Sequence, residues 1–309
     1  MKRLRIGLQG VGKIARDQHI PALRGSDAFE LVACASRNAT VEGVANFHDL
    51  AAMLEGRPDL DAVSVCTPPQ AHYEAVKMAL KAGKHVFLEK PPCTTLREFE
   101  ELVALARVAN RTLFQTWHSR YAKAVAPARA WLKDRTLRGG RVLWKENVRQ
   151  WHPGQSWIWA AGGFGVFDPG INAISILTEI APAPVFVRSA MLQVPSNCQS
   201  PIAADITFVT DAGAAIVAEF DFREEGHQIW TIELSTDAGV LELKNGGADL
   251  TINGKEIAVP DEAEEYPRLY GRFADLIRAG ACDVDARPFQ LVTDAFFVGA
   301  RRLVEPFED

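Results

Sequence analysis

LRIGLQGVGKIA, residues 4–15, sets an apolar run directly before a glycine-rich turn. The run at 4–8 is typical of a buried β-strand, and the residues from Gly10 onward predict a loop that opens a helix. Gly10 and Gly12 let the backbone turn and approach a pyrophosphate, which would meet the free amide groups at the start of that helix. Because strand, glycine turn and helix follow one another at the spacing of a βαβ unit, the stretch predicts a dinucleotide site. The alternative is a tight turn that binds nothing.

The first 119 residues continue this alternation of strands and helices. Mostly unbroken apolar runs predict further strands at 29–36, 61–67, 85–90 and 112–117, and helical patterns occupy 71–81 and 96–109. Thr94 or Thr95, with Glu98 close behind, suits the amino end of the second of these helices. Strands that are apolar on both faces indicate a parallel sheet covered by helices on both sides. Residues 1–119 are therefore expected to form an α/β, NAD(P)-binding Rossmann domain.

The period of the pattern changes after residue 119. Alternation of polar and apolar residues predicts longer strands at 141–150, 184–194, 204–210, 214–222, 229–236 and 239–244. Helices are expected at 120–135, 168–178, 268–279 and 288–303. Residues 120–309 are thus expected to form an α+β domain with an open, predominantly antiparallel sheet, used for substrate binding and oligomerisation. The exposed face of such a sheet suits a homo-oligomer, a dimer in particular.

Composition narrows the class of protein. A net charge of −5 over 309 residues argues against nucleic acid as a partner, because phosphate binding needs a basic surface. Five cysteines without a C-x-x-C pair indicate a reducing cytoplasm, and the histidines form no H-x-x-H or H-x-x-x-H pair, so no metal site is expected. The apolar stretch 157–178 is cut by glycines and by Asp168, which argues against a membrane helix.

The loops after the strands carry the remaining cofactor candidates. The second strand is followed by Ser36 and Arg37 where an NAD-specific site would carry a carboxylate, so NADP is expected to be preferred, with NAD also possible. The third and fourth strands end in CTPPQAH (66–72) and EKPP (89–92), at the edge where such folds bind ligands. Rigid turns would explain the same residues. The predicted cofactor-binding residues are Gly10, Gly12, Lys13, Ile14, Ser36, Arg37, Thr67, Pro68, His72, Glu89 and Lys90.

GGFGVFDPGINAISIL, residues 162–177, carries one ionisable group, Asp168. A buried carboxylate needs a partner to offset the loss of hydration. Asn172, four residues on, shares a helical face with it. Lys90, at the carboxyl end of the fourth strand, could be catalytic or positioning, or an ordinary surface lysine. The structural alternative for Asp168 is a helix N-cap, which Pro169 in the next position would suit.

Aromatic residues gather between these motifs. Trp144, Trp151, Trp157 and Trp159 lie within 16 residues, four of the seven tryptophans in the chain. Aromatic faces beside a few polar groups suit a sugar, which has both C–H faces and hydroxyls. Packing within the fold is the alternative for any single tryptophan.

Taken together, these motifs resemble the Gfo/Idh/MocA oxidoreductases. The likeness rests on Gly10-x-Gly12, on Glu89-Lys90-Pro91 and on Asp168-x-Gly170-x-Asn172. It implies a Rossmann domain joined to an open antiparallel sheet, with Lys90, Asp168 and the nicotinamide at one site. Residues 12–22, 116–120, 142–159 and 165–178 carry a more specific likeness to the bacterial aldose 1-dehydrogenases that act on L-arabinose and D-galactose.

The resemblance implies oxidation of C1 of an aldopyranose to the aldonolactone. Asp168 is expected to be the base, Lys90 to hold the C1 oxygen and Asn172 to orient the sugar, with Lys90 as the alternative base. Most members of the family carry histidine at the position of Asn172, and asparagine cannot accept a proton, so the base must lie elsewhere. Further sugar contacts are implied for His118, Glu146, His152 and Trp230. A cyclitol or dihydrodiol dehydrogenase and a non-catalytic sensor of sugars or nucleotides are the alternatives, and the sequence does not rank arabinose against galactose.

Overall fold

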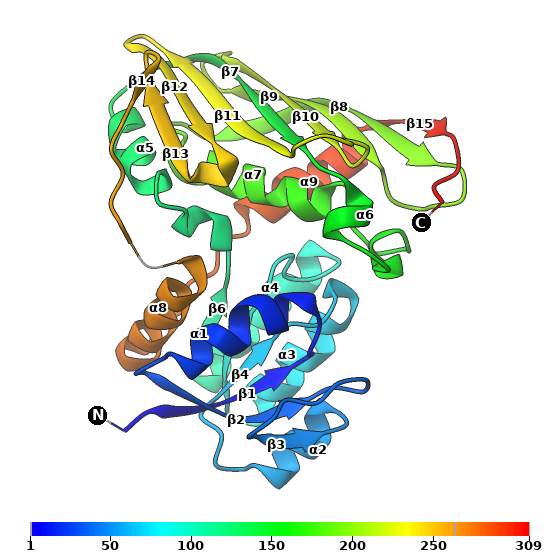
Figure 1. The fold of residues 1–309 in the computed structure, drawn as a ribbon, viewed down its shortest axis with the longest axis vertical. Coiled ribbons are helices and arrows are strands. Elements are labelled where there is room, and N and C mark those ends of the chain that lie inside the picture. Colours follow the sequence, from blue (N-terminus) through cyan, green and yellow to red (C-terminus); the bar gives the residue numbers. More distant parts are fainter. Residues whose placement is uncertain (1, 263, 309) are drawn as a thin grey trace. The chain divides into compact units, whose positions relative to one another are not determined.

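The computed structural model describes residues 2–262 and 264–308, and the chain divides into two compact units (Figure 1). The first unit comprises Met1–His118 together with Ala263–Asp285, and the second comprises Ser119–Glu262 together with Ala286–Asp309. The chain therefore returns to the first unit after building most of the second. The predicted division into residues 1–119 and 120–309 has one boundary, so it does not include this returning segment in the first unit.

The first unit is built on a six-stranded parallel sheet, which confirms the predicted Rossmann class. The strand order is β3-β2-β1-β4-β5-β6, so the direction of winding reverses between β1 and β4. Ligands of such sheets bind outside the carboxyl ends of the strands at this switch point. The strands are β1 (Leu4–Gln9), β2 (Phe29–Ala35), β3 (Ala45–Phe47), β4 (Ala62–Val65), β5 (His85–Leu88) and β6 (Leu113–Gln115).

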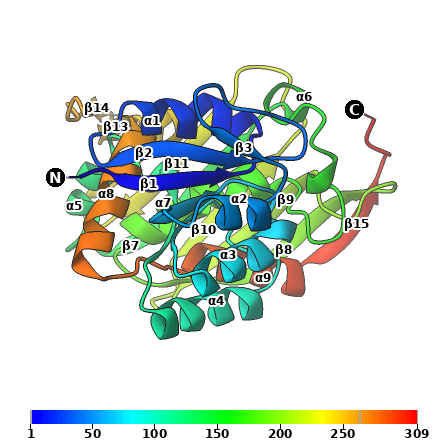
Figure 2. The same ribbon diagram turned by 90° about the horizontal axis from the view of Figure 1, so that it is seen from below.

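Helices cover both faces of this sheet, with α1 on one side and α3 and α4 on the other (Figure 2). The predicted helix at 96–109 is α4, and Thr95 begins it by accepting from the Glu98 amide in a capping box. The predicted opening helix is present, and it begins as a short π-helix, η1, that continues into α1. The helical segments are η1 (Ala15–His19), α1 (Ile20–Arg24), α2 (Leu50–Gly56), η2 (Pro69–Ala71), α3 (His72–Lys81), α4 (Leu96–Ala109) and α8 (Glu265–Ala279).

The returning helix α8 packs on the first unit through one apolar stripe. Tyr266, Tyr270 and Phe273 recur at helical spacing and are buried. Tyr270 stacks on Phe87 of β5 with ring centroids 4.6 Å apart, and Phe273 stacks on Phe29 of β2 at 5.5 Å. Stacked aromatic pairs of this kind add to the free energy of apolar burial, which explains why the segment docks here.

The second unit is built on a nine-stranded sheet of order β14-β13-β12-β11-β7-β10-β9-β8-β15. Two neighbouring pairs, β10–β7 and β15–β8, are parallel and the others are antiparallel, so the sheet is predominantly antiparallel, as predicted. The strands are β7 (Leu137–Lys145), β8 (Val185–Pro195), β9 (Ala203–Thr210), β10 (Ala215–Asp221), β11 (Ile229–Thr236), β12 (Gly239–Lys244), β13 (Asp249–Ile252), β14 (Lys255–Glu256) and β15 (Ala300–Val304).

Three predicted elements of this unit were wrong at their ends. The strand expected at 141–150 stops at Lys145, because the side chain of Asn147 accepts from the Arg149 amide and starts the short helix α6 (Val148–Trp151). The helix expected at 288–303 is α9 (Arg287–Val298), and the rest of that stretch forms β15 against β8. The helix expected at 120–135 is shorter, α5 (Val125–Leu132), and follows the 3₁₀ turn η3 (His118–Tyr121).

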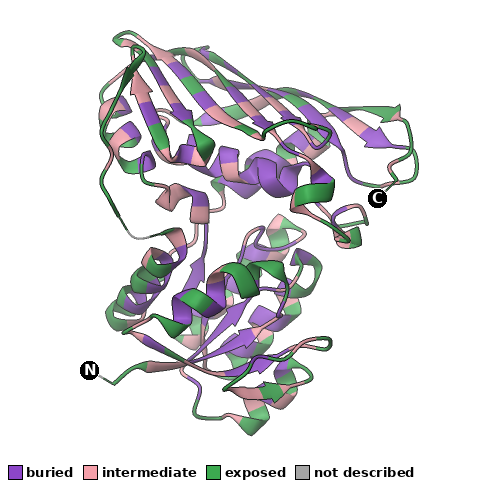
Figure 3. Ribbon diagram, in the orientation of Figure 1, coloured by how far each residue is buried: buried purple, intermediate pink, exposed green. Residues whose placement is uncertain are grey.

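One helix of the second unit carries the central motif. Helix α7 (Phe167–Ile180) is buried almost throughout its length, as Figure 3 shows. It packs against α5, α9 and strands β7 and β11. A Cβ on Gly170 would lie 2.7 Å from the ring of Phe220 on β10, so only glycine allows the helix to sit this close to the sheet. The core of the unit therefore fixes the position of Asp168.

Candidate functional site

The two glycines of the turn after β1 have different roles: the fold requires Gly10, whereas Gly12 leaves open space. Gly10 has φ +92°, and a Cβ there would lie 2.9 Å from Cγ2 of Thr67, so the fold itself requires glycine. A Cβ on Gly12 would meet no atom within 4 Å. The space at Gly12 is what a closely approaching pyrophosphate needs.

Two polar atoms beside this turn lack a partner. Oε1 of Gln9 and Oγ1 of Thr67 are buried and accept or donate no hydrogen bond within the described part of the chain. Buried polar atoms are nearly always paired, so such atoms at a strand edge suit a ligand that completes them. Together with the space at Gly12, they fit a dinucleotide cofactor held by the residues after β1 and β4.

The predicted ribose and loop residues lie at the surface. Arg37 is exposed and its guanidinium forms no ion pair with residues 2–262 or 264–308. Ser36 is half-buried, and its amide donates to Phe47, 3.0 Å away. On the glycine turn, Lys13 pairs with Asp17 one helical turn on, and Ile14 is exposed. These side chains are accessible to a cofactor from solvent.

His72 ties together the loops after β4 and β5. Its Nδ1 lies 3.0 Å from the carbonyl oxygen of Pro91, and its Nε2 faces the carbonyl of Thr67. Burial lowers the pKa of His72, although these carbonyl contacts oppose the shift. The imidazole is enclosed and does not reach the surface. It would therefore influence a cofactor only indirectly, by holding Thr67, the exposed Pro68 and the loop around Lys90 in position. Its predicted cofactor role stays a prediction.

Glu89 lies in a buried network that connects β5 to helix α8. Its Oε1 accepts from Nε2 of His19 at 3.0 Å and from the Tyr266 hydroxyl at 2.9 Å. Burial favours the neutral acid, but these donors outweigh it and lower the pKa of Glu89 to about 2. Burial also opposes charge on His19, yet interactions with Cys66, Tyr270 and Glu89 raise its pKa well above the ordinary value. The pair is therefore an ion pair inside the first unit.

This network reaches the backbone of Lys90. The other oxygen of Glu89 accepts from the Lys90 amide at 3.0 Å, and the Lys90–Pro91 peptide is cis. At its far end, the Tyr270 hydroxyl lies 2.7 Å from Nδ1 of His19 and 3.0 Å from Oγ of Ser64. Glu89 is thus a buried residue that holds the backbone of Lys90 in position. Lys90 itself is half-buried at the end of the strand. Sequence reasoning missed His19, Tyr266 and Tyr270, because no motif marks a buried network.

His118 is the last residue of the first unit and also contacts α8. Its Nδ1 lies 2.7 Å from a carboxylate oxygen of Glu265, and its ring stacks on Tyr266 at 5.8 Å. The ring is therefore oriented by the returning helix. A sugar contact from this residue stays a prediction.

Asp168 lies in the first turn of α7 and is 4 % exposed. The alternative in which it caps this helix is wrong: the N-cap is Val166, and no side chain caps the helix. Asn172 lies one turn further on, half-buried, and its side-chain amide makes no hydrogen bond to the described residues. A buried carboxylate and an available amide on one helical face suit recognition of a hydroxyl.

Three predicted substrate residues join Asp168 in one cluster of the second unit. Nε2 of His152 lies 3.0 Å from Oε1 of Glu146, and Nδ1 of His152 lies 3.6 Å from Oδ2 of Asp168. The indole of Trp230 donates to the other oxygen of Glu146 at 2.9 Å. The sequence singled out all four residues and also Gln155, whose Oε1 lies 3.4 Å from Nδ1 of His152.

The tryptophans divide into packing and accessible groups. Trp144 is buried and stacks on Trp230 with centroids 5.7 Å apart, and Trp151 lies 5.2 Å from the same ring. Trp159 packs on Phe222 and Phe307. Trp230 is half-buried, so its ring remains partly available to a sugar.

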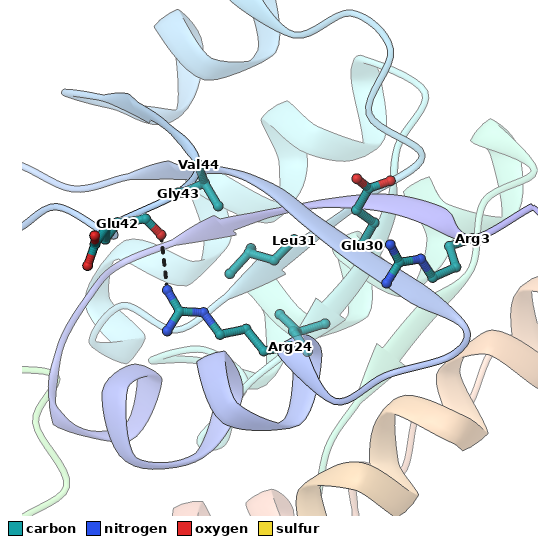
Figure 4. A pocket seen from close by; sticks show the side chains of 8 residues that line it. Arg3, Arg24, Glu30, Leu31, Glu42, Gly43 and Val44 are labelled. Atoms are coloured by element: carbon teal, nitrogen blue, oxygen red, sulfur yellow. Dashed lines mark hydrogen bonds between the residues drawn. The ribbon is translucent and has the colours of Figure 1, made fainter.

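A separate hollow lies over β2 in the first unit (Figure 4). Its lining includes Arg3, Arg24, Glu30 and Glu42, and Arg24 donates to the carbonyl of Glu42 at 3.0 Å. None of the predicted site residues lines it, and its arginines and glutamates give no preference for a charged ligand.

The described residues contain no cluster of three or more histidine, cysteine or acidic side chains able to hold a metal ion. Within the same ranges, no helix has both the length and the apolar character needed to cross a bilayer.

Comparison with known proteins decides the family. Residues 4–116 match the model of the GFO_IDH_MocA oxidoreductase family with an NAD-binding Rossmann fold. Galactose 1-dehydrogenase from Pseudomonas fluorescens is 47 % identical over the full length of both chains. The chain belongs to the Gfo/Idh/MocA family of oxidoreductases. The resemblance inferred from its motifs is thus confirmed.

Solved structures agree with this family assignment. D-galactose-1-dehydrogenase from Rhizobium etli superposes with a TM-score of 0.94 at 52 % identity, covering 100 % of this chain and 99 % of that one. A 3-ketoreductase from Actinomadura kijaniata, solved with TDP-benzene and NADP, gives a TM-score of 0.84 over 98 % and 100 % of the two chains. Its identity is 20 %, so it supports the Gfo/Idh/MocA fold alone.

Proposed function

We propose that this protein is an aldose 1-dehydrogenase that oxidises C1 of an aldopyranose, D-galactose or L-arabinose, to the aldonolactone with NADP⁺ preferred over NAD⁺. Two full-length relatives named as galactose 1-dehydrogenases, at 47 % and 52 % identity, support the reaction class. The observation that carries the proposal is the buried carboxylate of Asp168 with the available amide of Asn172 on the same face of α7.

Asp168 is the proton acceptor in this proposal. Asn172 stands where most family members carry histidine, and an amide cannot take a proton, so we assign the base to the buried carboxylate one helical turn before it. Asn172 holds the C1 hydroxyl or the ring oxygen. Lys90 donates a hydrogen bond to the C1 oxygen and favours its deprotonation, and Lys90 as the base is the alternative. The bound nicotinamide supplies the hydride acceptor.

Preference for NADP⁺ follows from the residues after β2. Ser36 and Arg37 offer no carboxylate to a ribose 2′-hydroxyl, and Arg37 is exposed with a guanidinium that can pair with a 2′-phosphate through two hydrogen bonds. The backbone around Gly10 and Gly12 would hold the pyrophosphate.

Further contacts to the sugar come from His118, His152, Trp230 and Glu146. Both oxygens of Glu146 already accept hydrogen bonds, from His152 and Trp230, although each keeps a second lone pair. His152 and the ring of Trp230 are more exposed than Glu146 and are therefore the more direct contacts.

The test is a panel of aldoses and polyols assayed separately with NAD⁺ and NADP⁺, with the product identified by NMR. Lactone formation from D-galactose or L-arabinose is expected, and turnover of cyclitols or dihydrodiols alone would overturn the substrate class. Asp168→Asn should bind NADP⁺ normally by fluorescence yet lose turnover by about two to four orders of magnitude. Near-normal turnover of that variant would refute Asp168 as the base.

A further inference from the structure

The second unit contains a buried series of carboxylate, imidazole and carboxylate: Asp168, His152 and Glu146. We infer that His152 receives the proton that Asp168 takes from the substrate hydroxyl, and that Glu146 holds the resulting imidazolium in place. The inference rests on the proposed function, in which Asp168 is the base. It gives His152 a second role beyond any contact with the sugar.

The shorter of the two carboxylate contacts of His152 indicates which nitrogen accepts a proton when the ring is neutral. Its Nε2 lies 3.0 Å from Oε1 of Glu146, so the neutral ring carries its hydrogen on Nε2 and donates it to that carboxylate. Nδ1 then presents a lone pair, and the carboxylate that faces it is Asp168, at 3.6 Å. This is the tautomer that a proton acceptor next to Asp168 requires.

Gln155 can serve both protonation states of the ring. Its Oε1 lies 3.4 Å from the same Nδ1 of His152. An amide can turn its NH₂ toward the lone pair of a neutral imidazole or its oxygen toward the N–H of an imidazolium. The position therefore tolerates a change of charge on His152.

Glu146 is held so that it can stabilise that charge. It is 3 % exposed, and its second oxygen accepts from the indole of Trp230 at 2.9 Å. A carboxylate fixed on one nitrogen orients the ring and stabilises the imidazolium when the other nitrogen takes a proton. Two carboxylates, Glu146 and Asp168, face the ring of His152 in this cluster.

Burial explains why Asp168 needs such an acceptor. Its side chain is 6 % exposed against 13 % for His152, so the imidazole is the more accessible group. The O–H bond of the C1 hydroxyl breaks and its proton goes to Asp168. The carboxyl O–H bond then breaks, the proton goes to Nδ1 of His152, and Asp168 is again a carboxylate. NADP⁺ is the oxidant and takes the hydride, so charge and atoms balance.

The distance of 3.6 Å between Nδ1 and Oδ2 exceeds that of a hydrogen bond. Catalytic contacts are often long in ligand-free structures and shorten in the complex with substrate.

The experiment compares His152→Gln with His227→Gln, a change of an exposed histidine outside the cluster. Glutamine keeps a polar side chain but cannot take up a proton. For His152→Gln we expect kcat to fall by about a hundredfold with KM for the sugar changed by less than about threefold. Added imidazole should restore part of kcat in this variant and leave the His227→Gln enzyme unaffected. A rise in KM at unchanged kcat, or no response to imidazole, would overturn the relay.

Two further measurements separate the relay from a structural role. In Glu146→Gln, the imidazolium of His152 loses the carboxylate that stabilises it, so the acidic limb of the kcat profile should move to lower pH. NMR titration of the His152 ring in the free protein reads the same shift without activity, and an unchanged titration would contradict the contact.

The variants also distinguish failure of the relay from failure of the proposed function. If Asp168→Asn is inactive while His152→Gln keeps its kcat, the relay is wrong and the dehydrogenase proposal stands. If Asp168→Asn is also active, the assignment of the base fails with it. Circular dichroism and binding of NADP⁺ establish that each variant is folded.

Discussion

Replacing His19 with leucine tests the buried ion pair of the first unit. The change leaves the Glu89 carboxylate enclosed with the Tyr266 hydroxyl and the Lys90 amide as donors, and without its cationic partner. Folding lowers the pKa of Glu89 from 4.5 to about 2, and at about 1.4 kcal/mol per unit this corresponds to about 3.5 kcal/mol of stability from all partners of the carboxylate together. Removing one partner of a buried pair typically costs about 3–5 kcal/mol. The two values agree.

The loss should depend on pH in a defined way. The pKa of Glu89 is lowered by folding, so its contribution is present above its unfolded value of 4.5 and disappears as the pH falls toward about 2. The pKa of His19 is raised by folding, so its contribution is complete below 6.5 and declines as the pH rises above that value. The difference between wild type and His19→Leu should therefore be largest between these limits, about pH 5 to 6.

Urea unfolding followed by far-UV circular dichroism measures the effect, with His48→Leu, an exposed position, as the control. The double variant His19→Leu/Glu89→Leu should recover part of the loss, because no buried charge is left unpaired. Equal stability of wild type and His19→Leu near pH 6, or a double variant less stable than the single one, would refute the ion pair.

Three changes in the first unit test the cofactor site. Arg37→Asp should raise KM for NADP⁺ by about tenfold or more and leave KM for NAD⁺ much less affected, because a carboxylate repels the 2′-phosphate; equal effects on both would contradict the assignment. Gly12→Val should weaken NADP⁺ binding in a fluorescence titration at unchanged melting temperature, since its side chain enters open space. Gly10→Ala, the matched change, should lower the melting temperature itself, because φ is +92° and Thr67 blocks the Cβ; a stable variant would contradict this geometry.

The sequence predicted the ends of a helix or strand correctly where contacts between residues close in the chain set those ends. Helix α4 begins at its capping box, and strands β11 and β12 follow their alternation to the predicted residues. Strand β15 escaped prediction because its pairing with β8 joins segments about a hundred residues apart. The return of α8 to the first unit depends on stacking with Phe29 and Phe87, which no local pattern encodes.

The same distinction applies to the candidate site. Asp168 was identifiable because a lone charge in an apolar stretch needs an explanation, and the structure places His152, the partner of Glu146, beside it. His19 was not, because its importance lies in contacts with residues 70 and 251 positions away along the chain. Buried polar networks depend on tertiary structure, so their members have no sequence signature.

The interleaving of the two units along the chain bears on how the protein is made. A ribosome that has released Met1–His118 has not yet produced α8, whose tyrosines complete the hydrogen bonds of Glu89 and His19. The buried polar groups of the amino-terminal sheet therefore lack these hydrogen-bond partners until nearly the whole chain has been synthesised. Expression of residues 1–118 alone should yield aggregation-prone material, and any excised version of this unit has to carry Ala263–Asp285 through an artificial connection.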